Sequence, residues 1–471
     1  MKKDNFFKRF GRAVRNEFVD FSEALIHGDW KTKLSVVLMG AGNIFRGQVV
    51  RGAAFLAVEL AFIWFMLNDG SYWLSMLPSL GKEGPGLTYD EFFDTYVYTY
   101  NDNSFKILLY GVLTIFAIIA VVIAWRMNIR EAYKAQKIEE AGKKVPHVWD
   151  DFKALFDEKF YKTLLALPVV GITLFTVLPL VFMILVAFTN YDGTHDGYVT
   201  NLFTWVGWQN FKTMLSTSAG GSYASVFRNM LGWTFIWAIF ATFSNYFLGI
   251  LVALMINKKG IKLKGMWRTI LVLTIAIPQF ISLLYISKMF DNNGIVNGLL
   301  LQWGWIEKPI QFWADKTLSR VMVVLINIWI GVPYLMLIAS GILMNIPQDL
   351  YESAKIDGAS PVQQFFHITM PYMLFITGPY LLTSFTGNMN NFNVIYLLTA
   401  GGPTSSAAST AAGNVGYTDL LITWLFKITT GTESQYYMAS VLGILVFVVV
   451  AIITLVVYGL LPSNRNEEDM Q

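Results

Sequence analysis

Long apolar runs separated by polar segments dominate this chain. An α-helix needs about 20 predominantly apolar residues to cross the hydrocarbon core of a bilayer. Eight runs approach or exceed that length: Gly52–Leu67, Phe105–Trp125, Leu164–Phe188, Met230–Ile256, Thr269–Met289, Val321–Met344, Tyr372–Leu398 and Met438–Leu461. The first is short and could begin earlier, within Leu34–Phe45. The pattern predicts an all-α polytopic membrane protein with about eight transmembrane helices.

Composition supports this class and narrows the chemistry. Of the 471 residues, 55% are hydrophobic and only 14% are charged, as in membrane proteins. No cysteine is present, which excludes disulfides, thiolate metal sites and cysteine nucleophiles. The four histidines, His27, His147, His195 and His367, are scattered without metal-ligand spacing. The sequence therefore implies neither a metal nor a small-molecule cofactor, and nothing in it points to nucleic acid.

A nucleotide site of the phosphate-loop type is absent from the sequence. The nearest approach is Gly260–Gly265, but Met266 and Trp267 follow it where that motif requires lysine and serine or threonine. We therefore expect a non-enzymatic subunit, with any ATP hydrolysis supplied by a partner.

Positive charge predicts the orientation in the membrane. With the N-terminus inside, 26 of the 35 Lys and Arg residues fall on the cytoplasmic side, which is where they are enriched. Both termini are then cytoplasmic, and aromatic-rich loops face outward. The basic, amphipathic stretch Met1–Trp30 lacks the compact apolar core of a cleavable signal peptide. It predicts a helix lying on the membrane surface or a short disordered tail.

Glu59 is a carboxylate within the apolar first span. Such a group invites a functional interpretation such as a proton relay. With no second acid near it in the sequence, interhelical bonding or a shallow position is the favoured interpretation.

A polar island separates the sixth and seventh apolar runs. Residues Leu350–Ala359 favour a helix, which Pro347 can start and Gly358 can end. Pro361 and Pro371 then bound a second short helix and the return to the membrane. A polar helix in place of a minimal turn indicates a docking element, and the positive-inside orientation places it in the cytoplasm.

Polar stripes run along the same two spans. Asn327, Gly331 and Tyr334 have the i, i+4, i+7 spacing of one helix face, and Ser384, Asn388 and Asn391 repeat it. Amide, hydroxyl and phenol groups can bind a neutral polyhydroxylated solute, and a phenol ring can stack on a sugar. The alternative is that they hold helices together, as Asn, Ser and Gly do in lipid. Spacing alone does not separate these interpretations.

Together these segments resemble ABC importer permeases. Glu352, Ser353, Ala354, Gly358, Ile368 and Pro371 match the "EAA" loop of that family. From about Phe227 onward the chain resembles the larger maltose and maltodextrin permease, the MalF type. The strings that carry this resemblance are Asn327–Tyr334, Leu350–Pro371, Ser384–Phe392, Leu397–Pro403 and Gly416–Leu421.

The resemblance implies a type I importer fold and a division of roles among residues. Sugar contacts would fall on Asn327, Gly331, Tyr334, Ser384, Asn388 and Asn391. Coupling to a cytosolic ATPase dimer would fall on Glu352, Ser353, Ala354, Asp357, Gly358 and Ala359. The other implied partners are a second, homologous permease, an extracellular sugar-binding protein, maltose or maltodextrin, and membrane lipid. Gly387 departs from the family, since some relatives carry an aromatic residue there.

The expected organisation has four parts. These are a cytoplasmic segment 1–51, helices 1–3 within 52–226, a permease core 227–461 with a coupling loop at 345–371, and a cytoplasmic tail 462–471. The loop Thr189–Phe227 is far shorter than the extracytoplasmic domain of Gram-negative relatives. The resemblance thus implies a permease in the cytoplasmic membrane of a Gram-positive bacterium. Rival interpretations are a permease for another neutral oligosaccharide, a membrane glycosyltransferase or a secondary carrier.

Overall fold

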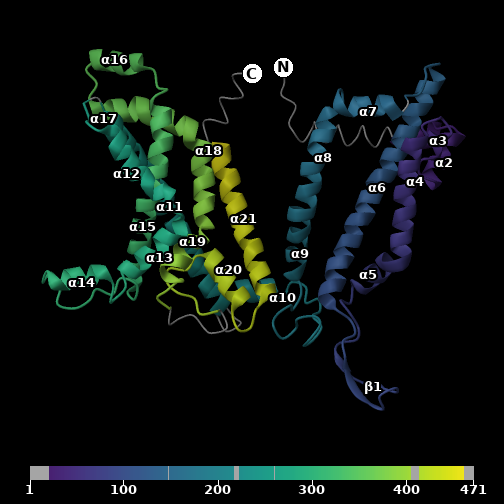
Figure 1. The fold of residues 1–471 in the computed structure, drawn as a ribbon, viewed down its shortest axis with the longest axis horizontal. Coiled ribbons are helices and arrows are strands. Elements are labelled where there is room, and N and C mark those ends of the chain that lie inside the picture. The colour runs from purple at the N-terminus through teal and green to yellow at the C-terminus, as the bar shows by residue number, and fades with distance from the viewer. Residues whose placement is uncertain (1–20, 147, 217–221, 259, 405–412, 461–471) are drawn as a thin grey trace. The chain divides into compact units, whose positions relative to one another are not determined.

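The structure is a computed structural model that describes residues 21–146, 148–216, 222–258, 260–404 and 413–460. The chain divides into two compact units, Met1–Trp205 and Val206–Gln471. Nearly all the regular structure within the described ranges is helical (Figure 1). The predicted tail 462–471, and the first 20 residues of the predicted N-terminal segment, lie outside the described residues.

The first unit consists of helices and one β-hairpin. In chain order its elements are α2 (Trp30–Val37), α3 (Ala41–Ile44), α4 (Val49–Phe65), the π-helical η1 (Met66–Gly70), α5 (Ser71–Met76), β1 (Gly86–Asp90), β2 (Thr95–Thr99), α6 (Ser104–Glu140), α7 (Val148–Phe156), α8 (Phe160–Ile172), the π-helical η2 (Thr173–Val177) and α9 (Leu178–Val186). Helices α4, η1 and α5 form one continuous span, Val49–Met76. The first span therefore begins close to its predicted start, and Leu34–Phe45 belongs instead to the separate helices α2 and α3.

Polar groups fasten α2 and α3 to α6. The buried amide of Asn128 on α6 accepts a hydrogen bond from Gly40 N at 2.7 Å and donates one to Ser35 O at 2.8 Å. The carboxylate of Glu59 accepts one from Met39 N at 2.8 Å. Glu59 thus ties the first span to the turn between α2 and α3. Of the two interpretations offered by the sequence, bonding between segments is the one observed.

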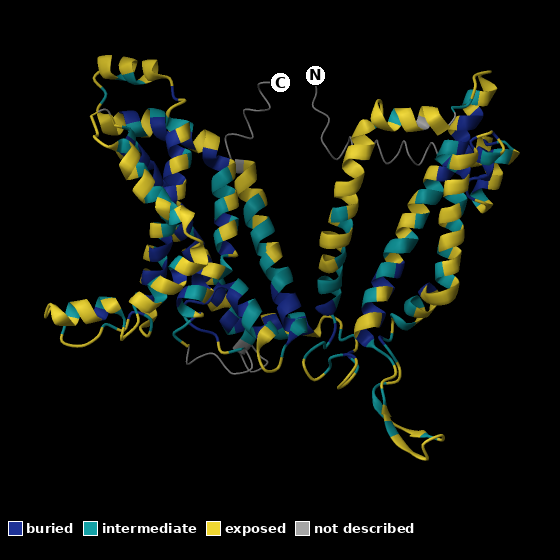
Figure 2. Cartoon of the chain, viewed as in Figure 1, coloured by how far each residue is buried: buried dark blue, intermediate teal, exposed yellow. Residues whose placement is uncertain are grey.

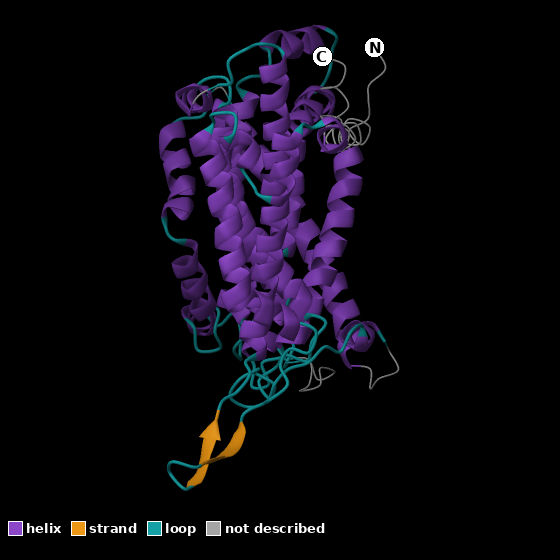
Figure 3. Cartoon of the chain, turned by 90° about the vertical axis from the view of Figure 1, so that its right-hand side faces the viewer, coloured by secondary structure: helices purple, strands orange, loops and turns teal. Residues whose placement is uncertain are grey.

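The hairpin is the one sheet among the described residues. Strands β1 and β2 pair antiparallel, with Gly86 opposite Thr99 and Asp90 opposite Thr95, in the segment predicted as an outward loop. They project from the end of α5 and α6 and are drawn orange in Figure 3. In Thr95–Thr99 the tyrosines alternate with the β-branched residues Thr and Val, which is a strand pattern within a segment predicted as a loop.

The second unit is a helical bundle. Its elements are α10 (Gln209–Leu215), α11 (Ser222–Asn257), α12 (Lys264–Ala276), α13 (Gln279–Met289), α14 (Ile295–Gln302), α15 (Lys316–Leu343), α16 (Gln348–Ile356), α17 (Pro361–Gln364), the π-helical η3 (Phe365–Thr369), α18 (Met370–Met389), α19 (Phe392–Thr399), α20 (Leu421–Thr430) and α21 (Tyr436–Leu460). In Figure 1, α16 lies at one end of this unit, and α14 and α20 lie at the other.

Helix α11 is central to the core of this unit. It packs along α15 and α18 through two apolar clusters. One cluster includes Trp237, Val323 and Ile395, and the other includes Tyr246 and Met336. Because these side chains pack closely against one another, their contacts fix how the helices cross.

The number of membrane-spanning helices agrees with the sequence. Within the described ranges, seven helices are long and apolar enough to cross a membrane, or eight if the pair α12–α13 counts as one span. That pair contains the predicted run Thr269–Met289 and bends by 92°. Pro278 lacks an N–H and disfavours a helical conformation at Ile277, whose ψ is 128°. The fold class is confirmed, and the fifth predicted run is bent at Pro278.

The predicted seventh span also differs in detail. Helix α18 ends at Met389, and α19 begins at Phe392, so the run Tyr372–Leu398 is broken near Asn390. At the other end, Pro371 does not interrupt the chain of helical turns from α17 through η3 into α18. The π-helical turn Phe365–Thr369 replaces regular bonding just before this proline, where a missing N–H can be accommodated.

Candidate functional site

The first predicted stripe lies along α15, but its residues differ in how far they are buried. Asn327 is 6% exposed, whereas Tyr334 is 51% exposed and its ring centroid lies 6.5 Å from that of Tyr380 on α18. Tyr380 lies four residues before Ser384 of the second stripe, on the same face of α18. The two stripes are thus brought together through the aromatic rings of Tyr334 and Tyr380.

Gly331 faces a neighbouring helix. A β-carbon at this position would lie 2.2 Å from Nδ2 of Asn245 on α11. Glycine therefore leaves room for the Asn245 amide where α11 and α15 cross. Its observed place favours the helix-packing interpretation for this member of the stripe.

The second stripe is divided by the end of α18. Asn388 Nδ2 donates to Thr242 Oγ1 on α11 at 3.0 Å, which joins the two helices. Asn391 lies beyond the helix, where its side chain accepts from Val394 N at 3.3 Å and caps α19. Its Nδ2 also donates to Asn388 Oδ1 at 3.3 Å. The expectation that Asn391 shares a continuous helix face with Ser384 and Asn388 is wrong, although it remains beside Asn388.

Two buried amides leave hydrogen-bonding capacity unused. Oδ1 of Asn245 and Nδ2 of Asn327 have no hydrogen-bond partner among the described residues. Buried polar atoms normally find partners, so these two atoms stand out as lacking one where α11 and α15 pack. Asn245 and Thr242 lie outside the two stripes predicted from the sequence. Both are polar residues inside the apolar run Met230–Ile256, and that was the available signal.

The predicted docking element is the helix α16. It begins at Gln348, directly after Pro347, and ends at Ile356. Gly358 has a φ of 79° and donates to Lys355 O at 3.1 Å, while Ala359 N donates to Ala354 O at 2.8 Å. These two bonds and the left-handed glycine form a Schellman motif, which satisfies the last carbonyls of the helix. The predicted start and stop are confirmed to within one residue.

Side-chain bonds hold α16 at the end of the bundle. Tyr351 Oη lies 2.8 Å from Thr369 Oγ1, and Gln364 Nε2 donates to Ala359 O at 2.9 Å. Glu352, Ser353, Asp357 and Gly358 are all exposed, and Ala354 and Ala359 are half-buried. The apolar side chain of Ile356 is 87% exposed. Figure 2 shows α16 as mainly exposed, so it offers a surface to a further chain.

At the opposite end of the unit, two of the family-like strings form one structure. Tyr417 N donates to Pro403 O at 2.8 Å, and Thr418 Oγ1 donates to Gly402 O at 2.6 Å. Asp419 accepts from Gly416 N at 2.7 Å and from Lys427 Nζ at 2.6 Å. We call residues 399–404 and 413–419 the outer knot. Two segments that are separate in sequence are thus one folded element.

The Asp419 carboxyl has an unusual environment. Burial raises its pKa above the ordinary value of 3.8, and the Lys427 ammonium and the Gly416 N–H oppose this only in part. Because its Oδ2 accepts from both Gly416 N and Lys427 Nζ, while its buried Oδ1 has no hydrogen-bond partner among the described residues, we assign Asp419 a structural role.

Comparison with known proteins decides the family. A family model described as "Binding-protein-dependent transport system inner membrane component" matches residues 245–465. The maltodextrin transport system permease protein MdxF of Bacillus subtilis is 34% identical over 447 residues, covering 93% of this chain and 97% of that protein. This chain belongs to the maltose and maltodextrin permease family of ABC importers. The family model matches most of the second unit, where the stripes, α16 and the outer knot lie.

A further relative broadens the range of substrates within the family. The galactooligosaccharides transport system permease protein GanP of Bacillus subtilis is 32% identical over 436 residues, covering 92% of this chain and 97% of that protein. A solved bacterial ABC transporter that imports the acidic polysaccharide alginate has a chain that matches with a TM-score of 0.52 at 22% identity. That match covers 68% of this chain and 98% of the other, and it shows the importer permease fold. The protein is thus a multi-pass membrane permease of a transport system.

Proposed function

We propose that this permease forms half of a pathway that imports malto-oligosaccharides across the cytoplasmic membrane. A second, homologous permease would complete the pathway, an extracellular binding protein would deliver the sugar, and a cytosolic ATPase dimer would supply energy. Family membership supports this assembly. The orientation, with both termini in the cytoplasm, rests on the positive-inside distribution of Lys and Arg.

One observation carries the proposed sugar site. Oδ1 of Asn245 on α11 and Nδ2 of Asn327 on α15 have no hydrogen-bond partner among the described residues. Tyr334 is exposed about two helix turns after Asn327. An acceptor, a donor and an aromatic face are what a neutral sugar needs for hydrogen bonding and stacking. We therefore place the sugar beside Asn327, Tyr334, Ser384 and Asn388. Gly331 and Asn391 contribute by positioning Asn245 and Asn388.

The chemistry of these side chains suits more than one neutral oligosaccharide. None of the six predicted stripe residues is charged. The identity to MdxF supports maltodextrin, while the similar identity to GanP supports a galacto-oligosaccharide as the second candidate. Both relatives come from Bacillus subtilis, which supports a Gram-positive source.

We propose that α16 is the coupling helix. Its exposed polar residues and the apolar side chain of Ile356 would contact the ATPase, and its bonds to η3 and α17 would transmit movement to α18. Closure of the ATPase dimer would then shift α16 as a rigid element and open the pathway outward. In this scheme residues 1–51 and 462–471 are cytoplasmic, 52–226 carry three spans, and 227–461 form the permease core.

Reconstituted transport tests the proposal. Proteoliposomes would contain this chain, its partner permease, the ATPase and the binding protein, and ATP-dependent uptake of radiolabelled maltotriose and galactotriose would be compared. We expect maltotriose uptake, because the maltodextrin permeases of two Gram-positive bacteria are 33–34% identical to this chain over 93% of its length. Tyr334→Ala should lower it about tenfold, since loss of a stacking and hydrogen-bonding partner weakens binding by one to two kcal/mol, to order of magnitude.

The matched control is Tyr285→Ala, because Tyr285 is 71% exposed on α13 and lies outside both stripes. If only galactotriose were taken up, the protein would still be an importer, but its substrate would be a galacto-oligosaccharide and not maltodextrin. Equal uptake by the wild type and Tyr334→Ala would show that the proposed sugar site is misplaced. No ATP-dependent uptake of either sugar would reject the proposed function.

A further inference from the structure

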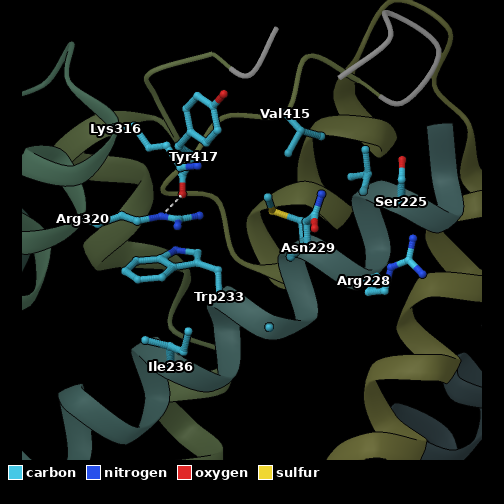
Figure 4. A pocket seen from close by; sticks show the side chains of 12 residues that line it. Ser225, Arg228, Asn229, Trp233, Ile236, Lys316, Arg320, Val415 and Tyr417 are labelled. Carbon is cyan, nitrogen blue, oxygen red and sulfur yellow. Dashed lines mark hydrogen bonds between the residues drawn. The ribbon is translucent and has the colours of Figure 1, made fainter. Parts of the chain in front are cut away.

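A pocket at the end of the second unit opposite α16 carries three cationic side chains. Its volume is about 380 Å³, and it is bounded by the first turns of α11, the first turns of α15 and the outer knot (Figure 4). Arg228, Lys316 and Arg320 line it, and none of the described residues that line it is acidic. We call this the basic pocket. It differs from the sugar stripes, which carry no charge.

Arg320 is held in place without neutralising its charge. Its Nε donates to Tyr417 O at 2.7 Å, and its guanidinium carbon lies 4.2 Å from the ring centroid of Trp233. Because Arg320 contacts only the carbonyl of Tyr417 and the ring of Trp233 in these two interactions, its two terminal nitrogens have no carboxylate partner among the described residues. In Figure 4 the head of Arg320 lies above Trp233 and extends toward the middle of the pocket.

The other two cations are also available. Lys316 Nζ lies 4.6 Å from the ring centroid of Tyr417, and Arg228 is exposed on α11. Two acids in the surrounding elements have other partners: Asp315 caps α15 through Thr317 N and Leu318 N, and Asp419 bonds Lys427. A fixed guanidinium flanked by two further cations is suited to bind a carboxylate by two parallel hydrogen bonds.

The position of the pocket favours a particular source for that carboxylate. Helix α15 runs from the basic pocket at Lys316 to the connection with α16 beyond Leu343. If α16 meets the cytosolic ATPase, the pocket opens on the outer side, where the sugar-binding protein arrives. Arg320 also precedes Asn327 by seven residues, so the pocket lies on the face of α15 that leads to the proposed sugar site.

We infer that the basic pocket receives an acidic side chain of the extracellular sugar-binding protein and thereby docks it above the pathway. This inference rests on the proposed function. Docking through charge would speed association and fix the orientation of the delivered sugar. The outer knot would respond to docking directly, because Arg320 bonds its Tyr417 carbonyl.

The test measures how the binding protein stimulates ATP hydrolysis. The complete transporter in proteoliposomes would be titrated with sugar-loaded binding protein purified from the same bacterium, at 50 and 300 mM salt. For Arg320→Gln we expect about a tenfold rise in the half-saturating concentration at low salt, with the same maximum rate. Arg228→Gln with Lys316→Gln should give a similar rise without touching the bond to Tyr417. Arg320→Lys should recover part of the affinity.

The control is Lys308→Gln, which removes one exposed cation outside the pocket on the same side of the unit. If Lys308→Gln raised the half-saturating concentration of the binding protein as much as the pocket variants do, the effect would come from charge in general, and the inference would be overturned. Unchanged half-saturation in both pocket variants while the wild type is still stimulated would also overturn it, and this result leaves the proposed function intact. If the half-saturating concentration rose in the pocket variants only when the vesicles contain phosphatidylglycerol, the pocket would be assigned to lipid headgroups, and the inference would be overturned. A wild type that the binding protein does not stimulate would reject the proposed function as well.

Discussion

Gly331 on α15 lies against the amide of Asn245 on α11, and a β-carbon there would approach Nδ2 to 2.2 Å. This contact lets the two helices cross closely and sets the position of one of the two amides with unused bonding capacity. The crossing therefore joins the packing of the second unit to its proposed sugar site.

Gly331→Ala should destabilise the permease and impair uptake together. Forcing an extra carbon into a close-packed contact costs about 1–3 kcal/mol, which outweighs the better helix propensity of alanine. Thermal unfolding of the purified chain in detergent would measure the loss. Gly341→Ala is the matched control on the same helix, because no atom lies within 4 Å of its added carbon. An unshifted midpoint for Gly331→Ala would contradict the packing argument.

Local rules explain why some elements could be predicted from the sequence. Apolar length predicts spans, and proline and glycine predict helix ends, so α16 was located between Pro347 and Gly358. These features depend on neighbouring residues in the chain. The fold class could therefore be stated without a structure.

Other features depend on tertiary contacts that spacing does not contain. By spacing alone, Asn391 would lie on the same helix face as Asn388. The helix ends between them, however, and Asn391 caps α19. Gly331 has stripe spacing, but only the crossing with α11 shows that its face is occupied by Asn245. The basic pocket likewise forms because the outer knot brings Tyr417 beside Arg320, from 97 residues away.

The end of α16 provides a second prediction. Gly358→Pro should abolish uptake while the chain still inserts, because proline cannot take a φ of 79° and cannot donate to Lys355 O. It also disfavours the helical conformation of Asp357, so the last turn should unwind. Uptake and ATPase co-purification would be measured together. Gly265→Ala on α12 is the control, since its added carbon meets nothing within 4 Å.

Glu352→Lys tests the same surface without changing the backbone. Glu352 is exposed on α16, so reversing its charge should leave the fold intact and weaken binding of the ATPase. We expect uptake to fall at least tenfold, with normal membrane insertion. Normal uptake in this variant would refute the assignment of α16 as the coupling helix.

The outer knot provides a fourth prediction. Gly401 has a φ of 85°, and a β-carbon there would lie 1.9 Å from Oδ1 of Asp419. Gly401→Ala should therefore displace Asp419 from Gly416 N and Lys427 and destabilise the unit by about 2–4 kcal/mol. Thermal unfolding would show the loss, and Gly298→Ala on α14, where the added carbon is unopposed, should show none. A stable Gly401→Ala variant would mean that the knot can rearrange.

A pH-dependent prediction concerns Arg46 in the first unit. Its side chain is fully buried and bonds Asp29 Oδ1 at 2.5 Å and Glu139 Oε2 at 3.0 Å. Burial by itself raises the pKa of Asp29, but the bonds from Thr32 N and Arg46 outweigh it and hold the pKa below 3.8. The stabilisation is therefore complete above the unfolded-state pKa and is lost as the pH falls through the lower folded-state value.

Asp29→Asn keeps an acceptor for Thr32 N and removes the charge. At pH 7 we expect it to lower the free energy of unfolding by about 1–2 kcal/mol, since a bond to a charged group is weakened while the geometry is kept. Below pH 3.8 the wild type should approach the variant, because the carboxyl of the unfolded chain is protonated there and that of the folded chain follows at lower pH. Thermal midpoints between pH 7 and 3 would measure this convergence. Asp69→Asn, at an exposed position of the same unit, should show no such difference. A gap between wild type and Asp29→Asn that stays constant across the range would refute the role of the Asp29 charge.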